Sequence, residues 1–395
     1  MPTKFSPFKR RRYFLSKKIV ILGTGTGGLV VANRLRKALS TEHEIVTVDQ
    51  NKNHLFNPSL LWVMVGWRDG QKIQKPLILL EKKGIRFLNA VVEKIDFENK
   101  VLETSLGNEN FDYLVIAPGA NTYPERLSGF TEAAHNLYDL SGVGNIRNSI
   151  THFDRGRLVL LIASMPFKCP AAPYEAALLL SKLLQKNRSE VEIELITPEP
   201  LPMGVAGPEV GKMVVSMLQS QNISFTSQHQ AMRINSEKKE IVFNDDKSTS
   251  YDFLVGVPPH GVPEFLQNSP LVGDSGWVKV NPKTLETELD QIYALGDVTG
   301  IPLSVGKPLP KAGVFAHFQA EVVAQRITSQ IEGVIPEKEF DGHGYCFIEL
   351  GDGRAGYASG NFYNEPKPLV NIKKPSKIWH WGKVLFEKWW LWKWF

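Results

Sequence analysis

The sequence predicts a mixed α/β fold in which two doubly wound units with parallel sheets are combined, the second inserted into the first. A glycine-rich turn joins a strand to a helix at residues 23–28, and a second strand–turn–helix pattern follows residue 157. A further strand and helix that fit the first unit return after residue 290. Short apolar strands that alternate with helical segments indicate βαβ crossovers and therefore parallel sheets. Both units are accordingly predicted to be Rossmann-type dinucleotide-binding domains.

Length and composition agree with a large globular protein. The chain has 395 residues, of which 43% are hydrophobic and 22% are charged, and this length exceeds one ordinary core. We expect residues 17–150 and 281–345 to form the first unit, residues 151–280 the second, and residues 346–395 a C-terminal region. The net charge of +5 weakly favours an anionic partner such as a membrane surface, and nothing resembles a nucleic-acid-binding module.

The first glycine-rich turn lies in the sequence context of a dinucleotide site. Residues 18–22 form an apolar strand pattern, Gly23-Thr24-Gly25-Thr26-Gly27-Gly28 matches G-x-G-x-x-G, and a helical segment follows at 29–35. A second strand pattern at 44–49 ends in an acid, Asp49. Strand, turn, helix, strand and a correctly spaced acid together are a specific signal, whereas the glycines alone would be a weak one.

Each residue of this turn has an expected role. Gly23 makes the tight turn, Gly25 lets the backbone approach the pyrophosphate, and Gly28 packs the helix on the strand. Asp49 would accept a hydrogen bond from the ribose 2′-hydroxyl. The alternative is a glycine turn that only packs.

Two later segments resemble glutathione-reductase-like flavoproteins and decide between FAD and NAD. Residues 111–120 form a strand pattern that ends in Ala117-Pro118-Gly119, which resembles that family's Ala-Thr-Gly turn apart from the proline. Residues 291–298 form a strand pattern that ends in Gly296-Asp297, and the resemblance implies that Asp297 binds the ribityl chain. The cofactor is therefore expected to be FAD.

A helical run at 314–327 follows Pro310-Lys311-Ala312-Gly313. In this class of flavoproteins the start of that helix, here Gly313, points at the pyrimidine end of the flavin. The positive end of the helix dipole would stabilise the negative charge of the reduced ring. Lys311 either adds its charge there or is an ordinary lysine at the start of a helix.

The second unit lacks the glycine-rich turn that a second dinucleotide would need. Strands and helices are predicted in it at 158–163, 192–197 and 252–257, and at 176–184 and 208–219, respectively. Where glycines would stand, the chain has Ser164-Met165-Pro166-Phe167-Lys168-Cys169. A proline and bulky side chains block the close approach of a pyrophosphate. We therefore expect that NAD(P)H is not the electron donor and that Cys169 provides another route.

The chain has only two cysteines, Cys169 and Cys346. Two thiols are too few for a disulfide scaffold or an all-cysteine zinc site, so no metal is expected, but they could form one working disulfide. The alternative is that each is a small buried apolar residue.

Several segments resemble the sulfide:quinone oxidoreductases and the flavoprotein subunit of flavocytochrome c sulfide dehydrogenases. Residues 167–176 are similar to the first redox-cysteine motif of this family, and residues 344–349 are similar to the second. Two further segments, 53–59 and 356–362, also resemble segments of this family, and the likeness covers roughly residues 17–395. Tyr357 and Phe362 in the second of them are expected to meet the quinone or the membrane. The resemblance implies an enzyme that oxidises hydrosulfide to zero-valent sulfur or polysulfide through FAD and passes the electrons to a quinone.

The resemblance also implies how the thiols work. Hydrosulfide would open a Cys169–Cys346 disulfide beside the flavin, and the electrons would pass through FAD to a quinone on its other face. Glu175, six residues after Cys169, is the candidate acid/base, or else a carboxylate that stabilises the first turn of a helix.

This chain departs from the family in two respects. Many relatives have a third cysteine, and a covalent flavin link would consume one of the two here, so FAD is expected to be held noncovalently. Some relatives carry a histidine after the strand predicted at 192–197, where this chain has Pro198-Glu199-Pro200.

Residues 378–395 hold six of the nine tryptophans of the chain. Three lysines are interspersed among them: Lys383, Lys388 and Lys393. This composition is typical of a segment that lies on a membrane surface, with tryptophans at the headgroups and lysines at lipid phosphates. Three of the tryptophans are expected to meet the membrane or the quinone: Trp389, Trp390 and Trp392. The alternative is a tail that packs on its own domain or on a second copy in a homo-oligomer.

We therefore expect a peripheral membrane protein on the cytoplasmic side. The chain contains no run of about 20 apolar residues that would span a bilayer. The basic residues 8–16 are either a solvated tail or an organelle-targeting segment.

Three alternative functions stay open on the sequence. The first is a sulfide dehydrogenase flavoprotein with a cytochrome acceptor, which should carry an export signal that is not visible here. The second is a type II NADH:quinone dehydrogenase, against which the missing second glycine turn argues. The third is a membrane-bound flavoprotein redox sensor whose disulfide only reports its state.

Overall fold

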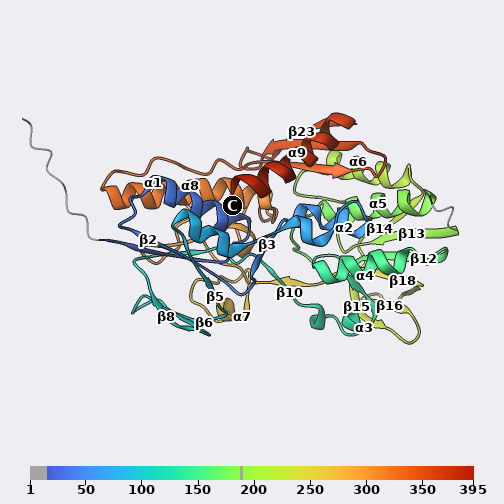
Figure 1. Cartoon of the computed structure of the whole chain (residues 1–395). Coiled ribbons are helices and arrows are strands. Elements are labelled where there is room, and N and C mark those ends of the chain that lie inside the picture. Colours follow the sequence, from blue (N-terminus) through green and yellow to red (C-terminus); the bar gives the residue numbers. More distant parts are fainter. Residues whose placement is uncertain (1–15, 187–189) are drawn as a thin grey trace, which may run out of the picture.

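The computed structural model describes residues 16–186 and 190–395 and has a mixed α/β fold with two parallel five-stranded sheets, one at each end of the molecule (Figure 1). Residues 8–15 of the predicted basic segment lie outside the described residues. The two parallel sheets confirm the predicted fold class at this level. Within the described ranges no helix is both long and apolar enough to cross a membrane.

The first sheet has the strand order β20-β9-β1-β2-β5. Its strands are β1 (Lys18–Leu22), β2 (Glu44–Asp49), β5 (Arg86–Asn89), β9 (Tyr113–Ile116) and β20 (Ile292–Ala294). Helices α1 (Thr26–Ala38) and α8 (Gly313–Glu332) pack against each other beside it. The chain leaves this sheet after β9 and returns to it only with β20, so the second sheet lies between them in sequence. Parallel register throughout places the carboxyl ends of these strands, and the turns that follow them, at one edge.

The second sheet has the order β11-β18-β12-β13-β14 and is also parallel. Its strands are β11 (His135–Asn136), β12 (Arg155–Ile162), β13 (Glu190–Ile196), β14 (Ile223–Thr226) and β18 (Phe253–Val257). Its main helices are α4 (Leu140–Ile150), α5 (Ala172–Lys186) and α6 (Pro208–Gln219). The predicted strands match β12, β13 and β18, whereas β11, with two residues, and β14, with four, are too short to stand out in the sequence. The predicted domain limits at 150, 280 and 345 stay predictions.

Smaller antiparallel sheets and short helices complete the fold. Their strands are β3 (Asn53–Leu55), β4 (Gln74–Pro76), β6 (Val92–Asp96), β7 (Val101–Thr104), β8 (Gly107–Asn110), β10 (Asn121–Thr122), β15 (Ala231–Asn235), β16 (Glu240–Phe243), β17 (Ser248–Ser250), β19 (His260–Gly261), β21 (His343–Glu349), β22 (Ala355–Asn361) and β23 (Leu369–Ser376). The short helices are α2 (Leu60–Met64), α3 (Phe130–Ala133) and α7 (Glu264–Gln267).

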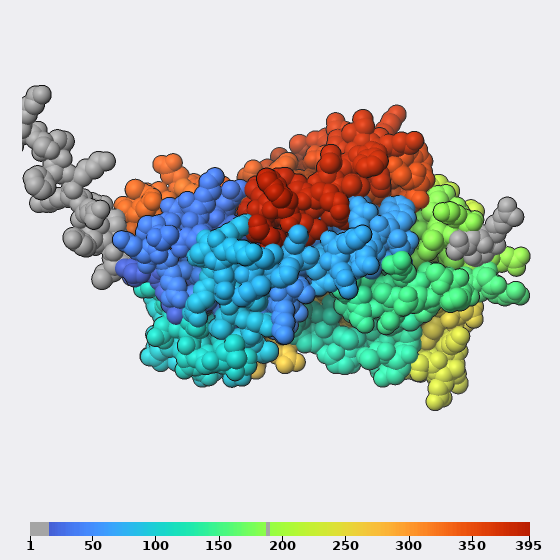
Figure 2. Space-filling model, viewed as in Figure 1, coloured from blue at the N-terminus to red at the C-terminus, as the bar shows by residue number. Residues whose placement is uncertain are grey.

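The C-terminal tail is one helix, α9 (Lys377–Lys393), which folds back over the body of the protein. Figure 2 shows these residues in dark red on one face of the molecule, next to blue residues of the N-terminal unit. Trp390 and Leu391 of α9, and Trp394 directly after it, are buried and belong to the same hydrophobic core as the helices of both sheets. The tail is therefore partly a core element and not only a surface segment.

Candidate cofactor and thiol site

The glycine-rich turn between β1 and α1 has the close packing that its sequence predicts. Gly23 adopts φ +84°, and a Cβ there would lie 2.5 Å from the carbonyl oxygen of Ala117. A Cβ at Gly28 would lie 1.9 Å from the carbonyl oxygen of Gly23, whereas one at Gly25 would meet no described atom within 4 Å. The turn is thus closed on its protein side and open at Gly25, where a phosphate would approach.

The contact at Gly28 makes a testable prediction. Because the obstructing atom belongs to the backbone and cannot rotate away, Gly28→Ala should lower the free energy of unfolding by about 1–3 kcal/mol or more. Thermal or denaturant unfolding measures this loss, and the flavin content of the purified variant reports the damage to the turn.

Gly144→Ala is the matched control, because a Cβ at this helical glycine of α4 meets no described atom within 4 Å. Alanine favours a helix over glycine by about 1 kcal/mol, so this variant should be at least as stable as the wild type. Equal stability of Gly28→Ala and wild type would contradict the assigned packing.

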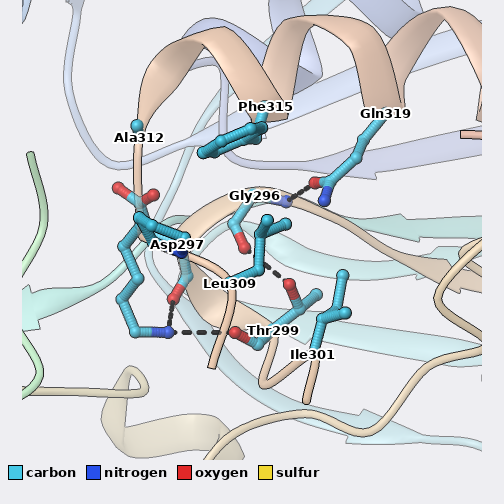
Figure 3. A pocket seen from close by; sticks show the side chains of 10 residues that line it. Gly296, Asp297, Thr299, Ile301, Leu309, Ala312, Phe315 and Gln319 are labelled. Carbon is cyan, nitrogen blue, oxygen red and sulfur yellow. Dashed lines mark hydrogen bonds between the residues drawn. The ribbon is translucent and has the colours of Figure 1, made fainter. Parts of the chain in front are cut away.

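A polar pocket lies where β20 ends and α8 begins, and Figure 3 shows its lining. Lys311 Nζ donates to the carbonyl oxygens of Asp297 and Thr299, at 2.8 and 2.9 Å, and lies 3.3 Å from the centre of the Trp277 ring. Burial lowers the pKa of Lys311 to about 7, while Asp297 opposes this change. Lys311 therefore holds the turn that carries Asp297 in place.

Asp297 offers an acceptor that the described protein does not use. Its Oδ1 is buried and has no hydrogen-bond partner within residues 16–186 and 190–395, and burial raises the pKa of its carboxyl group. A buried acceptor of this kind is costly unless a ligand donates to it. A ribityl hydroxyl would be such a donor, and α8 begins directly beside it at Gly313. Together with the open position at Gly25, these residues fit a flavin dinucleotide.

Two other predicted cofactor residues lie in the same region. Asp49, at the end of β2, accepts a hydrogen bond from the backbone N–H of Thr24 at 2.7 Å, which ties the carboxylate to the glycine-rich turn. Gly119 has φ +77° and no described atom within 4 Å of an added Cβ. Asp49 is thus tied to the glycine-rich turn, and Gly119 leaves open space where a side chain would stand.

The loop that carries Cys169 is anchored to the first unit. The backbone N–H of Cys169 donates to the carbonyl oxygen of Lys311 at 2.6 Å, and Lys168 Nζ donates to the carbonyl oxygen of Ala120 at 3.2 Å. Tyr138 donates its hydroxyl to the carbonyl oxygen of Cys169 at 3.3 Å. Cys169 itself has φ +50°, a left-handed conformation that is uncommon for a residue with a side chain. These contacts hold the thiol next to the segment between Asp297 and α8.

Cys346, from β21, lies on the same cavity as Cys169 although 177 positions separate them in the chain. The cavity has a volume of about 410 Å³ and is mainly apolar, with Phe362 among its lining residues. Both thiols are free in the described part of the chain, and Cys169 is exposed toward this space. The fold thus brings together the two residues whose pairing the family resemblance implied.

The protein around the two thiols disfavours their charged forms. Desolvation by the surrounding chain, and next the charge of Glu175, raise the pKa of the Cys169 thiol to about 12. The pKa of Cys346 is raised by the same cause, and next by the charges of Cys169 and Glu175. For both thiols Lys383 acts in the opposite direction. A carboxylate and an ammonium group therefore lie close enough to both sulfurs to affect them.

Lys383 is the functional residue that sequence reasoning missed. It was expected to reach lipid phosphates, but it is only 7% exposed and forms an ion pair with Glu175, which is 4% exposed. The lysine is turned inward because it shares the inner face of α9 with the buried residues Glu387 and Trp390. The helical spacing of these positions was the signal that could have separated it from Lys388.

The residues predicted to meet the membrane or the quinone differ in their exposure and in their partners. Trp389 and Trp392 are exposed, by 38% and 77%, whereas Trp390 is buried. Trp390 Nε1 donates to His54 Nε2 at 3.1 Å, and His54 Nδ1 donates to the carbonyl oxygen of Thr24 at 3.0 Å. Trp390 therefore joins α9 to the glycine-rich turn instead of facing outward. Tyr357 stacks on Trp379 of α9 with ring centres 4.5 Å apart.

Comparison with known proteins finds one matching family and several similar oxidoreductases. The model of the family described as pyridine nucleotide-disulphide oxidoreductase matches residues 17–161 and 173–320. The mitochondrial sulfide:quinone oxidoreductase of Mus musculus is 21% identical over 88% of this chain and 79% of that protein. The sulfide-quinone reductase of Aquifex aeolicus is 27% identical over 96% of this chain and 91% of that protein. A type II NADH:quinone oxidoreductase of Staphylococcus aureus is 25% identical over 82% of this chain and 84% of that protein.

The fold has a counterpart among solved structures. The X-ray structure of the sulfide:quinone oxidoreductase from Aquifex aeolicus superposes with a TM-score of 0.86 and 25% identity, covering 96% of this chain and 91% of that one. Similarity therefore extends over nearly the whole chain.

Proposed function

The chain belongs to the pyridine nucleotide-disulphide oxidoreductase family, and we propose that within this family it is a sulfide:quinone oxidoreductase. One observation carries the proposal. Where a nicotinamide-binding unit would have a glycine-rich turn, the second unit presents Cys169, and the only other cysteine of the chain, Cys346, lies on the same cavity.

The flavin cofactor is FAD, held without a covalent bond. Its pyrophosphate would lie at Gly23, Gly25 and Gly28, its ribityl chain at Asp297, and its ring near the start of α8 at Gly313. When bound, the flavin would supply a two-electron carrier between the thiol side and a quinone. Both cysteines stay available for redox chemistry in this arrangement.

The thiols carry out the sulfur chemistry. In the oxidised state they form a Cys169–Cys346 disulfide, and hydrosulfide attacks one of its sulfurs, which breaks the S–S bond and leaves a persulfide and a thiolate. Glu175, the buried carboxylate beside both sulfurs, accepts the persulfide proton. Each turnover converts hydrosulfide into zero-valent sulfur and one proton and releases two electrons.

The outer face of α9 docks on a membrane surface. Five large apolar side chains are exposed on it at helical spacing: Ile378, Trp381, Leu385, Trp389 and Trp392. Such a stripe suits the boundary between headgroups and acyl chains, and it would put the cavity within reach of a membrane quinone. We propose peripheral attachment on the cytoplasmic side, and a homo-oligomer stays an open expectation.

Anaerobic assays with sulfide and a short-chain quinone test this function, with NADH as the parallel donor. We expect sulfide to bleach the flavin, quinone to restore it, and NADH to leave it oxidised. The loop at Cys169 offers bulky residues where a pyrophosphate would have to approach. Bleaching by NADH but not by sulfide would overturn the proposal in favour of an NADH dehydrogenase. If sulfide bleached the flavin and only a cytochrome reoxidised it, the result would overturn the proposal in favour of a cytochrome-linked enzyme. Bleaching by sulfide without turnover would overturn it in favour of a redox sensor.

A further inference from the structure

Four ionisable groups from three segments that are far apart in the sequence lie near the two thiols. Glu175 lies in the first turn of α5, Glu349 at the end of β21, and Lys383 and His380 on α9. Glu175, Glu349 and Lys383 are all buried, and Glu349 is fully so. Lys383 pairs with Glu175, while His380 Nδ1 lies 3.0 Å from a Glu349 oxygen. The two carboxylates therefore have separate partners, both supplied by the C-terminal helix.

Glu175 needs this lysine in order to be charged. Burial raises the pKa of its carboxyl group, and the nearby Glu349 charge acts in the same direction. Lys383 acts against both through its charge and its hydrogen bond, and the backbone N–H of Glu349 contributes less. A buried carboxylate without a cation takes up a proton and can no longer act as a base.

Lys383 is itself held firmly in position. Its Nζ lies 5.0 Å from the centre of the Trp62 ring, which adds a cation–π contact to the ion pair. Glu175 and Lys383 act on both thiols, and Asp297, Lys168 and Tyr138 act on Cys169, besides the interaction of the two thiols with each other. Lys383 is the cation that acts on both thiols.

We propose that Lys383 of the C-terminal helix is a positioning residue that holds the Glu175 carboxylate, in its charged form, beside Cys169 and Cys346. Glu175 is the proton acceptor of the proposed function, and on that function this inference rests. The same helix that presents the apolar stripe on its outer face thus completes the thiol site with its inner face.

Thiol alkylation tests the proposal without sulfide or quinone. The flavin-loaded full chain is reduced, desalted and treated anaerobically with iodoacetamide at pH 8, and modification of each cysteine is followed by mass spectrometry. In Glu175→Gln, Lys383 keeps its charge without a counter-ion, so thiolate formation is favoured and alkylation should be about tenfold faster or more. In Glu175→Gln/Lys383→Met this acceleration should disappear.

The single variant Lys383→Met should alkylate at nearly the wild-type rate, because Glu175 then takes up a proton and the site stays neutral. An acceleration that persists in the double variant, or none in Glu175→Gln, would overturn the proposal. Because this assay involves no substrate, its failure is distinguishable from failure of the proposed function.

The pH dependence of sulfide-driven flavin reduction is the second measurement. Glu175 must be deprotonated to act, so the rate falls as pH drops through its pKa. Loss of Lys383 raises that pKa, so the acidic limb of the profile in Lys383→Met should move to higher pH by about one unit or more. Lys383→Arg keeps the positive charge, so the acidic limb of its profile should lie at the same pH as in the wild type.

Lys377→Met is the matched control, because this lysine is exposed at the start of the same helix, and its profile should equal that of the wild type. An unshifted limb in Lys383→Met, or a shift of equal size in Lys377→Met, would overturn the proposal.

Discussion

Replacing Cys346 by serine is expected to abolish the sulfide-driven bleaching of the flavin, by a factor of about 10³ or more, and Cys169→Ser should do the same. A serine hydroxyl forms neither a disulfide nor a persulfide, so hydrosulfide has no sulfur to attack and its electrons have no route to the flavin. Both thiols border one cavity, and the described chain provides no third sulfur nucleophile there. The measurement is anaerobic stopped-flow absorbance of the flavin after mixing with sulfide.

Two comparisons separate loss of chemistry from loss of structure. Chemical reduction with dithionite should bleach the flavin in every variant, because it bypasses the thiols. Ser359→Ala removes a hydroxyl from the lining of the same cavity and should react with sulfide as the wild type does. Wild-type bleaching in either cysteine variant would rule out the disulfide route.

Removing the apolar stripe of α9 is expected to release the protein from membranes without loss of flavin. Trp381, Leu385 and Trp392 are 61%, 66% and 77% exposed, so they have little part in the fold. Burying one such side chain is worth about 1.5–3 kcal/mol. The triple substitution Trp381→Ser/Leu385→Ser/Trp392→Ser should therefore weaken binding to vesicles by about a hundredfold or more. Co-sedimentation with vesicles that contain anionic lipid measures this loss.

The inner face of the same helix provides the matched control. Trp390→Phe removes the hydrogen bond to His54 but leaves the outer stripe intact, so it should bind vesicles like the wild type. Deletion of α9 would be an ambiguous test, because it also takes Trp390, Leu391 and Trp394 out of the core. A triple variant that still sediments fully with vesicles would show that this stripe is not the docking surface.

Local patterns in the sequence predict many of the helices and strands because short-range interactions determine these elements. The first strand, the helix after the glycine-rich turn and the second strand appear as β1, α1 and β2, and the helix predicted at 208–219 is α6 (Pro208–Gln219). Hydrophobic periodicity and the spacing of glycines act within one turn or one βαβ unit, so one segment is enough to recognise them. The substitution of the second glycine-rich turn by the loop at Cys169 is visible for the same reason.

Only the tertiary structure decides which distant side chains meet. The ion pair between Lys383 and Glu175 joins positions 208 residues apart, and the bond between Trp390 and His54 joins positions 336 apart. The sequence by itself determined the nucleotide-binding turn, the candidate thiols and the amphipathic tail, because each depends on nearby residues. The folded chain decided that the tail has an inner face within the site, because helical spacing can place a lysine on an inner face but does not identify the distant carboxylate that it meets.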